Sequence, residues 1–506
     1  MLTLRALLPT LGLLGAVGPA LALPPDGLPV PSALEPAVGF WQRIYTEVTV
    51  DEGIIHDTAL PMRIVARVDV PRPPQWQARR EAITRALDRH RRALRALAEA
   101  SMQPANARQA ALRARLPGAM DAAAARVLAD RLRFQGGLRE RFRDGLVRSG
   151  RWQAHIRAAL AEHGVPAALA ALPHVESSFN PRARSHAGAA GLWQFTAGTG
   201  RRFLRIDPLV DERLDPWRSS RAAAALLAHN HAEIGSWPLA ITAYNHGLNG
   251  MRRAVEALGS QDYMAIRRDY EGARFGFSSK NFYPALIAAA RVDRQAGQHF
   301  PGLRRDSAVA VVRVELPHYT PLNTLRDGLD IDRATLLRLN PALGPSIRDA
   351  RKFIPRGYGL VLPRSDQRDW ARAVAQLPGD RLYRDQRPSR THRVDRGQTL
   401  SGIAARYGVG VSDLMATNGI TDPRRLRAGQ RLDLPIAGAD PRVVGGRRYE
   451  VRPGDTLGGI AVRHDVGTDQ LMRMNELEHP DRIRAGQQLI ISQAASVAVV
   501  DMADEP

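Results

Sequence analysis

One carboxylate, Glu176, stands in the otherwise apolar stretch LPHVESSFNP at residues 172–181. The stretch has a helical pattern that stops at Asn180-Pro181, because the residue before a proline is driven out of the helical region. Glu176 therefore lies in a last helical turn, where the negative end of the helix dipole disfavours a carboxylate. Partial burial by the apolar neighbours acts in the same direction, and both effects raise the pKa of a carboxyl.

A carboxyl that keeps its proton near neutral pH can serve as a general acid. The alternative is a surface glutamate paired with one of the chain's many arginines. The residues that follow Glu176 in the sequence favour its role as a general acid over that of a paired surface glutamate. The loop PRARSHAGAAG (181–191) has small residues that let a ligand approach the backbone, and GLWQF (191–195) and ITAYNHG (241–247) add rings and amides. Rings and amides around one carboxyl are typical of a carbohydrate groove, since sugars have apolar faces and hydroxyl edges.

Other titratable residues have simpler explanations. Asp211, Glu212 and Asp215 could supply a second catalytic carboxylate, but DERLDP is typical of a turn and a helix start. His229 and His231 are two residues apart on a predicted helix, so they point to nearly opposite sides and do not form a metal site. We expect neither a metal nor a cofactor.

The surrounding pattern predicts a compact all-α unit that positions Glu176. RWQAHIRAALAEHG repeats Trp152, Ile156 and Leu160 at helical spacing and stops at Gly164. Pro166 opens the helix that carries Glu176. Further helices are predicted over about 216–234, 237–245, 250–258 and 280–294.

The chain of 506 residues is too long for one core. Its first residues have the pattern of an export signal: Arg5, the apolar stretch LLPTLGLLGAV, and the small-x-small site Ala20-Leu21-Ala22. We expect cleavage near residue 22, with an uncleaved anchor as the alternative. With no cysteine in the sequence, neither disulfides nor a lipid anchor through Cys can form. The expected location is the periplasm or cell envelope.

The formal net charge is +21, and Lys280 and Lys352 are the only lysines. Such a charge could indicate a nucleic-acid binder. However, the arginines are scattered along Ala/Leu helices without stacking aromatics, which is the pattern of solvated helix faces. We therefore expect no nucleic-acid partner, and at most a peripheral attraction to envelope polyanions.

The C-terminal part repeats. HRVDRGQTLSGIAARYGVGVSDLMATNG (392–419) aligns without a gap on YEVRPGDTLGGIAVRHDVGTDQLMRMNE (449–476). Each unit reads strand, Gly turn, helix, short helix and strand, and Thr399 and Thr456 fit helix N-caps. ATLLRLNPAL (334–343) and IPRGYGLVLP (354–363) match only the second half of such a unit, so we interpret this region as a degenerate module that packs beneath the helical unit.

Taken together, VESSFNP, AGAAGLWQF, TGRRF, DERLDP and LAITAYNHG resemble the consecutive motifs of the soluble lytic murein transglycosylases, most of all the MltD type of glycoside hydrolase family 23. The resemblance covers about residues 140–300 and implies a lysozyme-like α fold. The repeats resemble LysM modules, which bind N-acetylglucosamine units of peptidoglycan. His174 departs from the family pattern, which has an aliphatic residue there.

The resemblance implies an enzyme that cleaves peptidoglycan between N-acetylmuramic acid and N-acetylglucosamine without water, leaving 1,6-anhydromuramoyl ends. Glu176 would be its single acid and base. Ser185 would steady the N-acetyl group, Gln194, Tyr244 and Asn245 would line the groove, and Tyr283 would hydrogen-bond near Glu176. The alternatives are a non-catalytic peptidoglycan-binding adaptor and a hydrolytic muramidase.

The LysM resemblance places a glycan groove between the Gly-x-Thr-Leu turn and the segment after the second helix of each unit. The expected groove residues are Gln398, Thr399, Leu400, Asn418 and Ile420 in the first unit, and Asp455, Thr456, Leu457, Asn475 and Leu477 in the second. Leu400 and Leu457 could instead be core residues, and Asn418 and Asn475 could simply end a helix.

The expected fold class is mainly α: a lysozyme-like α domain followed by small α+β (βααβ) modules. The expected order is a signal peptide (1–22), a largely helical N-terminal region (23–140), the transglycosylase-like domain (141–300), the degenerate module (301–365), a linker (366–390), the first LysM unit (391–435), a linker (436–446), the second LysM unit (447–492) and a disordered tail (493–506).

Overall fold

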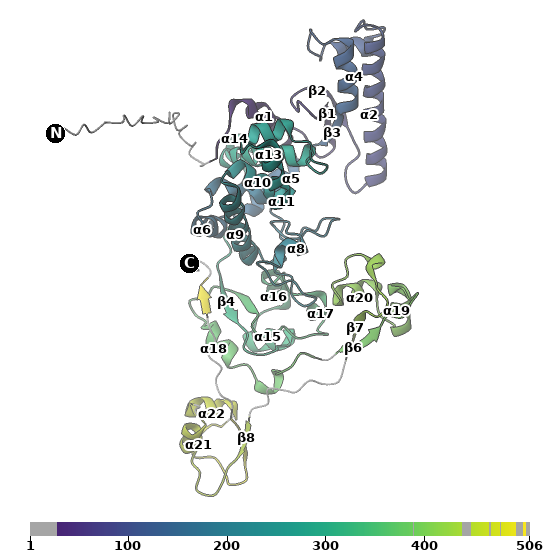
Figure 1. Ribbon diagram of the computed structural model, residues 1–506. Coiled ribbons are helices and arrows are strands. Elements are labelled where there is room, and N and C mark those ends of the chain that lie inside the picture. Colours follow the sequence, from purple (N-terminus) through teal and green to yellow (C-terminus); the bar gives the residue numbers. More distant parts are fainter. Residues whose placement is uncertain are drawn as a thin grey trace, which may run out of the picture.

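A computed structural model describes residues 28–387, 389–437, 447–464, 467–475, 477–491 and 499–501. A helical body carries a long helical arm on one side and three small α+β units on the other (Figure 1). The predicted export signal and residues 438–446 of the second linker lie outside the described residues. Within the described ranges, no helix is both long and apolar enough to cross a membrane.

The helical body follows the sequence pattern. Its longest helix, α9(Pro216–Ile234), begins after Asp215, whose side chain accepts hydrogen bonds from the first-turn N–H groups, and ends at Gly235 with φ of 74°. The other helices of the body are α5(Arg139–Ser149), α6(Gln153–Glu162), α7(Leu172–Glu176), α8(Ala197–Gly200), α10(Trp237–His246), α11(Leu248–Leu258), α12(Tyr263–Asp269), α13(Phe277–Arg294) and α14(Ala296–His299), with the 3-10 turns η2(Ala167–Ala171) and η3(Glu212–Leu214).

The N-terminal segment belongs to this body rather than preceding it. After the turn η1(Ser32–Leu34), α1(Glu35–Thr46) packs against α13, and its residues Phe40, Ile44 and Tyr45 share one buried core with α13. This corrects the expectation that residues 23–140 form a separate region. The apolar stripe of α1 has to be covered, and α13 covers it.

The arm contains a three-stranded antiparallel sheet in the order β2-β1-β3 and a pair of helices with a core of their own, including Leu94, Leu97 and Leu128. The alternating stretch RIVARVDV (63–70) contains the edge strand β2, and β1 lies between it and β3. The elements are β1(Glu52–Asp57), β2(Ile64–Asp69), α2(Trp76–Glu99), α3(Ala107–Arg113), α4(Ala122–Arg131) and β3(Leu132–Gly136).

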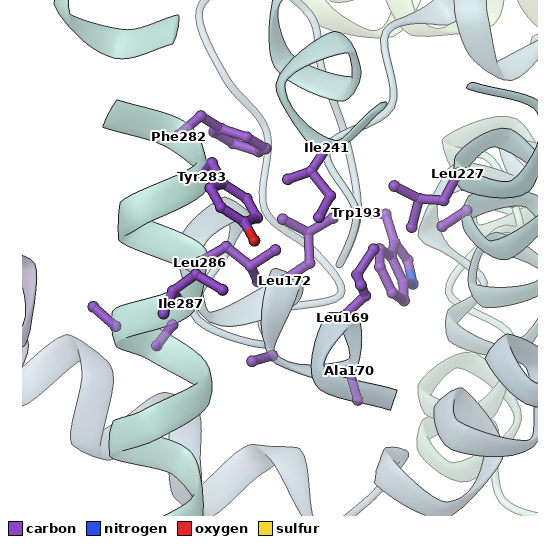
Figure 2. Packing of buried hydrophobic residues seen from close by; sticks show 14 of the residues in the cluster. Leu169, Ala170, Leu172, Trp193, Leu227, Ile241, Phe282, Tyr283, Leu286 and Ile287 are labelled. Atoms are coloured by element: carbon purple, nitrogen blue, oxygen red, sulfur yellow. The ribbon is translucent and has the colours of Figure 1, made fainter. Parts of the chain in front are cut away.

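The buried core of the helical body packs against α7, the helix that ends at Glu176. Figure 2 shows Leu172 of α7 among Tyr283 and Leu286 of α13 and Ile241 of α10. Trp193 is fully buried beside this group, and its indole N–H donates to Ser220 Oγ at 2.9 Å. The short helix α7 is thus fixed by packing rather than by its own length, since five residues cannot hold a helix alone.

The region expected to be half a module is a complete βααβ unit. It consists of β4(Val311–Glu315), α15(Leu322–Leu329), α16(Arg333–Leu339), α17(Pro345–Arg348) and β5(Gly359–Pro363), with β4 and β5 paired antiparallel. It is followed by α18(Trp370–Ala375) and the turn η4(Gly379–Arg381). The first half escaped notice because Tyr319 and Pro321 stand where the repeats have the Gly and the Thr of Gly-x-Thr-Leu.

The two repeats have the same order of elements. The first unit has β6(Ser389–Arg393), α19(Leu400–Tyr407), α20(Val411–Thr417), η5(Pro423–Arg425) and β7(Arg431–Ala437). The second has β8(Arg447–Glu450), α21(Leu457–Arg463), α22(Thr468–Met474) and β9(Gln488–Ile491). In each unit the two strands pair antiparallel and the helices cover one small apolar core.

One asparagine ties the second helix to the closing strand in all three units. The side-chain N–H₂ of Asn418 donates to the carbonyls of Leu414 and Asp433, and its Oδ1 accepts from Asp433 N–H. Asn475 makes the same three bonds in the second repeat, and Asn340 makes them in the 301–365 region. The 301–365 region is therefore a third copy of the module fold.

This third copy is fastened to the helical body. Arg313 of β4 forms an ion pair with Asp215 at 3.0 Å, and both side chains are buried. Backbone hydrogen bonds join Asp211 N–H to Ala342 O and Gly344 N–H to Leu209 O. A buried pair is costly unless both charges are fully hydrogen-bonded, and Asp215 also caps α9. The contact supports the expected packing role of this region.

The tail was expected to be disordered from residue 493. Residues 499–501 instead form β10(Val499–Asp501), which pairs antiparallel with the free edge of β4. Two β-branched valines suit an added edge strand. The remainder of the tail lies outside the described residues.

Asn340→Ala should lower the free energy of unfolding by about 2 kcal/mol or more, because buried backbone groups of Leu336 and Val361 would lose their partner. Differential scanning calorimetry of the full chain would measure it. The matched control is Asn249→Ala at an exposed position of α11. Equal stability of the two variants would contradict the structural role of Asn340.

Candidate active site

Glu176 ends α7 at a sharp turn that several groups hold in place. Ser178 and Phe179 both have left-handed backbone conformations, with φ of 51° and 56°. Such angles are unfavourable outside glycine and persist only where the surroundings enforce them. Arg148 donates two hydrogen bonds to Ser178 O, at 2.7 and 3.1 Å, and Ser177 Oγ donates to Leu192 O at 2.7 Å. The turn is therefore rigid.

Burial raises the pKa of Glu176 to about 8. The residue keeps partial solvent exposure, so a substrate oxygen can reach it. No residue in the described part of the chain forms an ion pair with it, and Arg148 of α5, which contacts the following turn, donates to the carbonyl of Ser178. At neutral pH the carboxyl is thus mostly protonated, which is the state that a general acid requires.

Two tyrosines from distant helices lie within electrostatic range of this carboxyl. Burial together with the Glu176 charge raises the pKa of Tyr45 and of Tyr244. Tyr244 was predicted, and its hydroxyl donates to Trp193 O at 2.7 Å. Tyr45 was missed, because it lies on α1, far outside the motifs around Glu176, and nothing in its local sequence marks it.

A stack of aromatic rings packs against the turn that follows Glu176. Tyr45 stacks on Phe142 with centroids 4.6 Å apart, Phe142 stacks on His174 at 4.6 Å, and His174 meets the edge of Phe179 at 4.5 Å. This arrangement explains the departure from the family pattern at His174. The imidazole packs as a flat ring between aromatics where an aliphatic side chain would otherwise fill the space.

His174 is also held by a hydrogen bond to a buried carboxylate. Its Nε2 lies 3.0 Å from Asp293, which in turn pairs with Arg305 at 2.9 Å. Burial lowers the pKa of His174, so the ring is neutral and donates from Nε2 to the carboxylate. Although burial alone would raise the pKa of Asp293, its bonds to His174 and Arg305 lower it overall. The network fixes the residue two positions before Glu176.

The predicted groove residues lie on the segment 185–194 that follows the Glu176 turn and at the end of α10. Ser185 is exposed, and its Oγ accepts from Ala189 N–H at 3.0 Å, which closes the small-residue loop. Gln194 has φ of 48° and donates from its amide to Gly191 O at 2.9 Å. Asn245 is exposed at the end of α10 and accepts from Ser279 Oγ at 3.4 Å.

Tyr283 has a different role from the one expected. Its side chain is fully buried in α13, and its hydroxyl donates to Pro29 O at 2.7 Å (Figure 2). Burial raises the pKa of Tyr283, with the neighbouring Tyr263 as the second cause. The expected hydrogen bond near Glu176 is thus corrected: Tyr283 anchors the N-terminal segment, and Tyr45 lies near the acid.

The acidic residues of DERLDP have structural partners. Asp211 pairs with Arg213 at 2.8 Å, Glu212 accepts from Arg205 N–H at 2.7 Å, and Asp215 caps α9. This agrees with a turn and helix start rather than a second catalytic carboxylate. His231 stacks on Trp237 with centroids 4.1 Å apart. Across the described ranges, no group of three or more His, Asp or Glu side chains could hold a metal ion.

The residues expected in the LysM grooves are largely used by the modules themselves. Leu400 and Leu457 are core residues, 2% and 1% exposed, which corrects their expected place in a groove. Asn418 and Asn475 use their amides on the closing strands, as described above. Ile420 and Leu477 are partly buried against their cores.

The polar members of the set stabilise the entrance turns. Thr399 and Thr456 are N-caps that accept from the N–H groups of Gly402 and Gly459. Gln398 bonds to His392 and Asp395, and Asp455 bonds to Tyr449 and Arg463. The entrance turns are therefore held by Gln398, Thr399, Asp455 and Thr456. The exposed backbone of these turns remains available for a ligand.

Comparisons with known proteins match the helical body and the two C-terminal repeats to known families. The family model described as Transglycosylase SLT domain matches residues 153–266, and that of the LysM domain matches 392–435 and 449–492. The chain is 29% identical over 344 residues to membrane-bound lytic murein transglycosylase D of Escherichia coli, covering 66% of this chain and 74% of that protein.

Two further matches are shorter. A putative tributyltin chloride resistance protein of an Alteromonas species is 37% identical over 171 residues, which cover 33% of this chain and 81% of that protein. Among solved structures, the soluble lytic transglycosylase SLT70 from Escherichia coli aligns with a TM-score of 0.25 and 20% identity, over 28% of this chain and 24% of that one.

Glu176→Gln should stabilise the protein at neutral and alkaline pH. A carboxyl whose pKa is raised in the folded state destabilises the fold increasingly as pH rises from its unfolded pKa through about 8. The amide removes this term, so we expect a gain of about 1–3 kcal/mol at pH 8 and almost none at pH 4. Urea unfolding at both values measures it, with exposed Glu256→Gln as control. A gain that does not depend on pH would refute the raised pKa.

Proposed function

This chain belongs to the lytic murein transglycosylases that carry an SLT domain and LysM modules, and we propose that Glu176 carries their reaction in it. The activity is cleavage of peptidoglycan glycan strands between N-acetylmuramic acid and N-acetylglucosamine. The observation that supports the assignment best is the lone, partly exposed carboxyl with its pKa raised to about 8. Its position in the VESSFNP motif agrees with that role.

The reaction needs only one carboxyl. Glu176 in its protonated form donates to the glycosidic oxygen, and the bond from that oxygen to C1 of the muramic acid breaks. The resulting carboxylate accepts the proton of the C6 hydroxyl of the same sugar, whose oxygen bonds to C1. Glu176 is thereby protonated again, and no water is consumed. The internal hydroxyl has a high effective concentration, which favours ring closure over hydrolysis.

Hydrolytic glycosidases place a second carboxylate near the bond to activate water or attack the sugar. Here the nearby candidates Asp211, Glu212 and Asp215 have structural partners, as described above. A site with a single carboxyl that has no ion-pair partner suits an internal nucleophile. This favours the transglycosylase reaction over hydrolysis by a muramidase.

The surrounding residues would hold the glycan. Exposed Ser185 and Asn245 offer hydroxyl and amide groups for sugar substituents, and Gln194 is held by its hydrogen bond to Gly191 O. Tyr244, anchored on Trp193 O, would keep water away from Glu176 and position its carboxyl. Tyr45 of α1 would likewise keep water away from Glu176 and position its carboxyl.

The LysM modules would bring the enzyme to its insoluble substrate. The grooves would be formed mainly by the exposed backbone of the entrance turns and the segments near Ile420 and Leu477. An exported protein in the periplasm or cell envelope, attached peripherally through glycan and charge, would meet peptidoglycan directly. Peptidoglycan glycan strands are the partner we expect, without nucleic acid.

Glu176→Gln should reduce cleavage of purified peptidoglycan at least ~100-fold while binding to sacculi persists, because the amide keeps the shape but cannot cycle a proton. Mass spectrometry of wild-type digests should show 1,6-anhydromuramic ends. Reducing ends, heavier by one water, would instead indicate hydrolysis. A variant that keeps a third of the activity would exclude Glu176 as the acid.

Removal of residues 391–506 should spare cleavage of short soluble glycans but weaken binding to whole sacculi. Two weak grooves on one strand can raise avidity ~100-fold over either alone. Sedimentation with purified sacculi measures this. A second truncation after Ile491 keeps both modules and lacks only β10, so it should bind like the full chain. If the shorter protein sediments equally well, the modules are not the anchor.

A further inference from the structure

Three arginines lie where the loop that follows Glu176 meets the third module copy. Arg182 and Arg184 are exposed on the loop 181–191, and Arg348 is the last residue of α17 in the third copy. None of them was among the site residues predicted from the sequence. We call Arg182, Arg184 and Arg348 the arginine cluster.

Backbone contacts bring the two sides of the cluster together. Arg184 pairs with Asp211 at 3.3 Å, and the backbone N–H of Asp211 donates to Ala342 O at 2.9 Å. Arg348 donates to the two carbonyls that flank Ala342, at 2.7 and 2.9 Å. Burial lowers the pKa of Arg348, and the charges of Arg182 and Arg184 act in the same direction. Both loop guanidinium groups therefore lie within electrostatic range of Arg348.

The loop side of the cluster stays positive after its carboxylate neighbour is counted. Asp211 is shared, because it pairs with the buried Arg213 as well as with Arg184. Arg182 forms no ion pair within the described ranges, and its exposed side chain has no hydrogen bond there. Asp211 thus balances one of these three arginines, and a net positive charge remains beside the groove.

Arg348 is held in place without losing its charge. Its Nε and Nη2 donate to backbone carbonyls, and its Nη1 makes no hydrogen bond within the described part of the chain. The adjacent carboxylate, Asp349, pairs with Arg351 at 2.9 Å. A half-buried guanidinium that is already oriented loses little side-chain entropy when it binds a carboxylate.

The loop is preorganised next to Ser185. The N–H of Gly191 donates to Ala183 O at 2.9 Å, and the amide of Gln194 donates to the same oxygen at 3.3 Å. Gly191 has φ of 84°, and a Cβ there would lie 1.7 Å from Arg213 O, so only glycine fits. The loop arginines therefore keep a fixed place relative to Ser185.

The substrate of the proposed function, on which this step rests, carries the complementary charge at the matching place. In muramic acid the peptide stem is joined through the lactyl group at C3, next to the N-acetyl group at C2. With that N-acetyl group at Ser185, as the motifs imply, the stem of the same sugar leaves the groove beside Arg184 and Arg182. Stem peptides carry free carboxylates, and the N–H groups of a guanidinium match a carboxylate in geometry and charge.

We propose that the arginine cluster binds the carboxylates of the peptide stem on the muramic acid unit that Glu176 cleaves. The third module copy thereby contributes a substrate contact through Arg348 in addition to packing on the helical body. The consequence is a preference for glycan strands with charged stems. Because the contact is made in the bound substrate as well as during the reaction, the preference lies in KM rather than in kcat.

The preference is measured on soluble stem-bearing glycan chains in two forms, with free stem carboxyls and with those carboxyls converted to amides. For the wild-type protein, kcat/KM for the charged form should exceed that for the amide form about fivefold, and added salt should reduce this ratio. Arg182→Gln should lower the ratio to about two, and Arg182→Glu to about one or less. Since the Arg182 side chain is exposed and makes no hydrogen bond within the described residues, these variants should fold normally.

The matched control is Arg89→Gln, which removes the same charge from an exposed position of α2. This helix belongs to the arm, on the other side of the helical body from the third copy (Figure 1). The ratio should keep its wild-type value in this variant. The Kd values of the two forms for Glu176→Gln, with and without Arg182→Gln, give the same comparison without cleavage. Both proteins keep their LysM modules, so the difference between them isolates Arg182.

A ratio near one in the wild type overturns the proposal, as does a ratio that Arg182→Gln leaves unchanged. If Arg89→Gln lowers the ratio as much as Arg182→Gln, the effect is one of net charge and the proposal also fails. If the wild type cleaves neither form, the proposed reaction is refuted, and the Kd ratios alone decide whether the arginine cluster binds the stem. A ratio lowered by Arg182→Gln and kept by Arg89→Gln supports the proposal.

Discussion

The structure depends on keeping one partly buried carboxyl without an ion-pair partner in a chain with 72 basic residues. Many other carboxylates have an arginine partner, such as Glu162 with Arg221 and Asp211 with Arg213. Among the described residues none pairs with Glu176. Arg148, which contacts the turn after Glu176, is directed to the carbonyl of Ser178 instead. Had either of its bonds gone to Glu176, the pKa of that carboxyl would fall and the acid would be lost.

This constraint accounts for the length of chain that surrounds the site. Tyr45 of α1 and Tyr244 of α10 feel the charge of Glu176, and Phe142 of α5 stacks between Tyr45 and His174, so the rings at the site come from three separate parts of the sequence. The left-handed turn after α7 follows directly on the carboxyl, and the His174–Asp293–Arg305 network fixes the residue two positions before it. An acid kept neutral above its usual pKa lowers stability, which the large common core of α1 and α13 offsets.

The sequence predicts what local signals determine. The bounds of α9 follow from Asp215, Pro216 and Gly235, and Glu176 is marked by its place between an apolar helix and Asn-Pro. Tyr45 could not be found in this way, because its role arises only when α1 packs on the body. Residues repeated between the modules, such as Leu400 and Leu457, are mostly those that make the fold. A repeat therefore does not distinguish a core residue from a ligand contact. The sequence of the third copy shows only its second half, and the structure completes it with β4, α15 and the bonds of Asn340.

The central claim is the protonation of Glu176 at neutral pH, and a direct titration tests it. Carboxyl carbons labelled with ¹³C in all glutamates can be followed by NMR from pH 3 to 10, and comparison with Glu176→Gln identifies the signal of Glu176. The account predicts that this signal titrates with a pKa of about 8. A midpoint near 4.3, about that of a solvated glutamate, would contradict it.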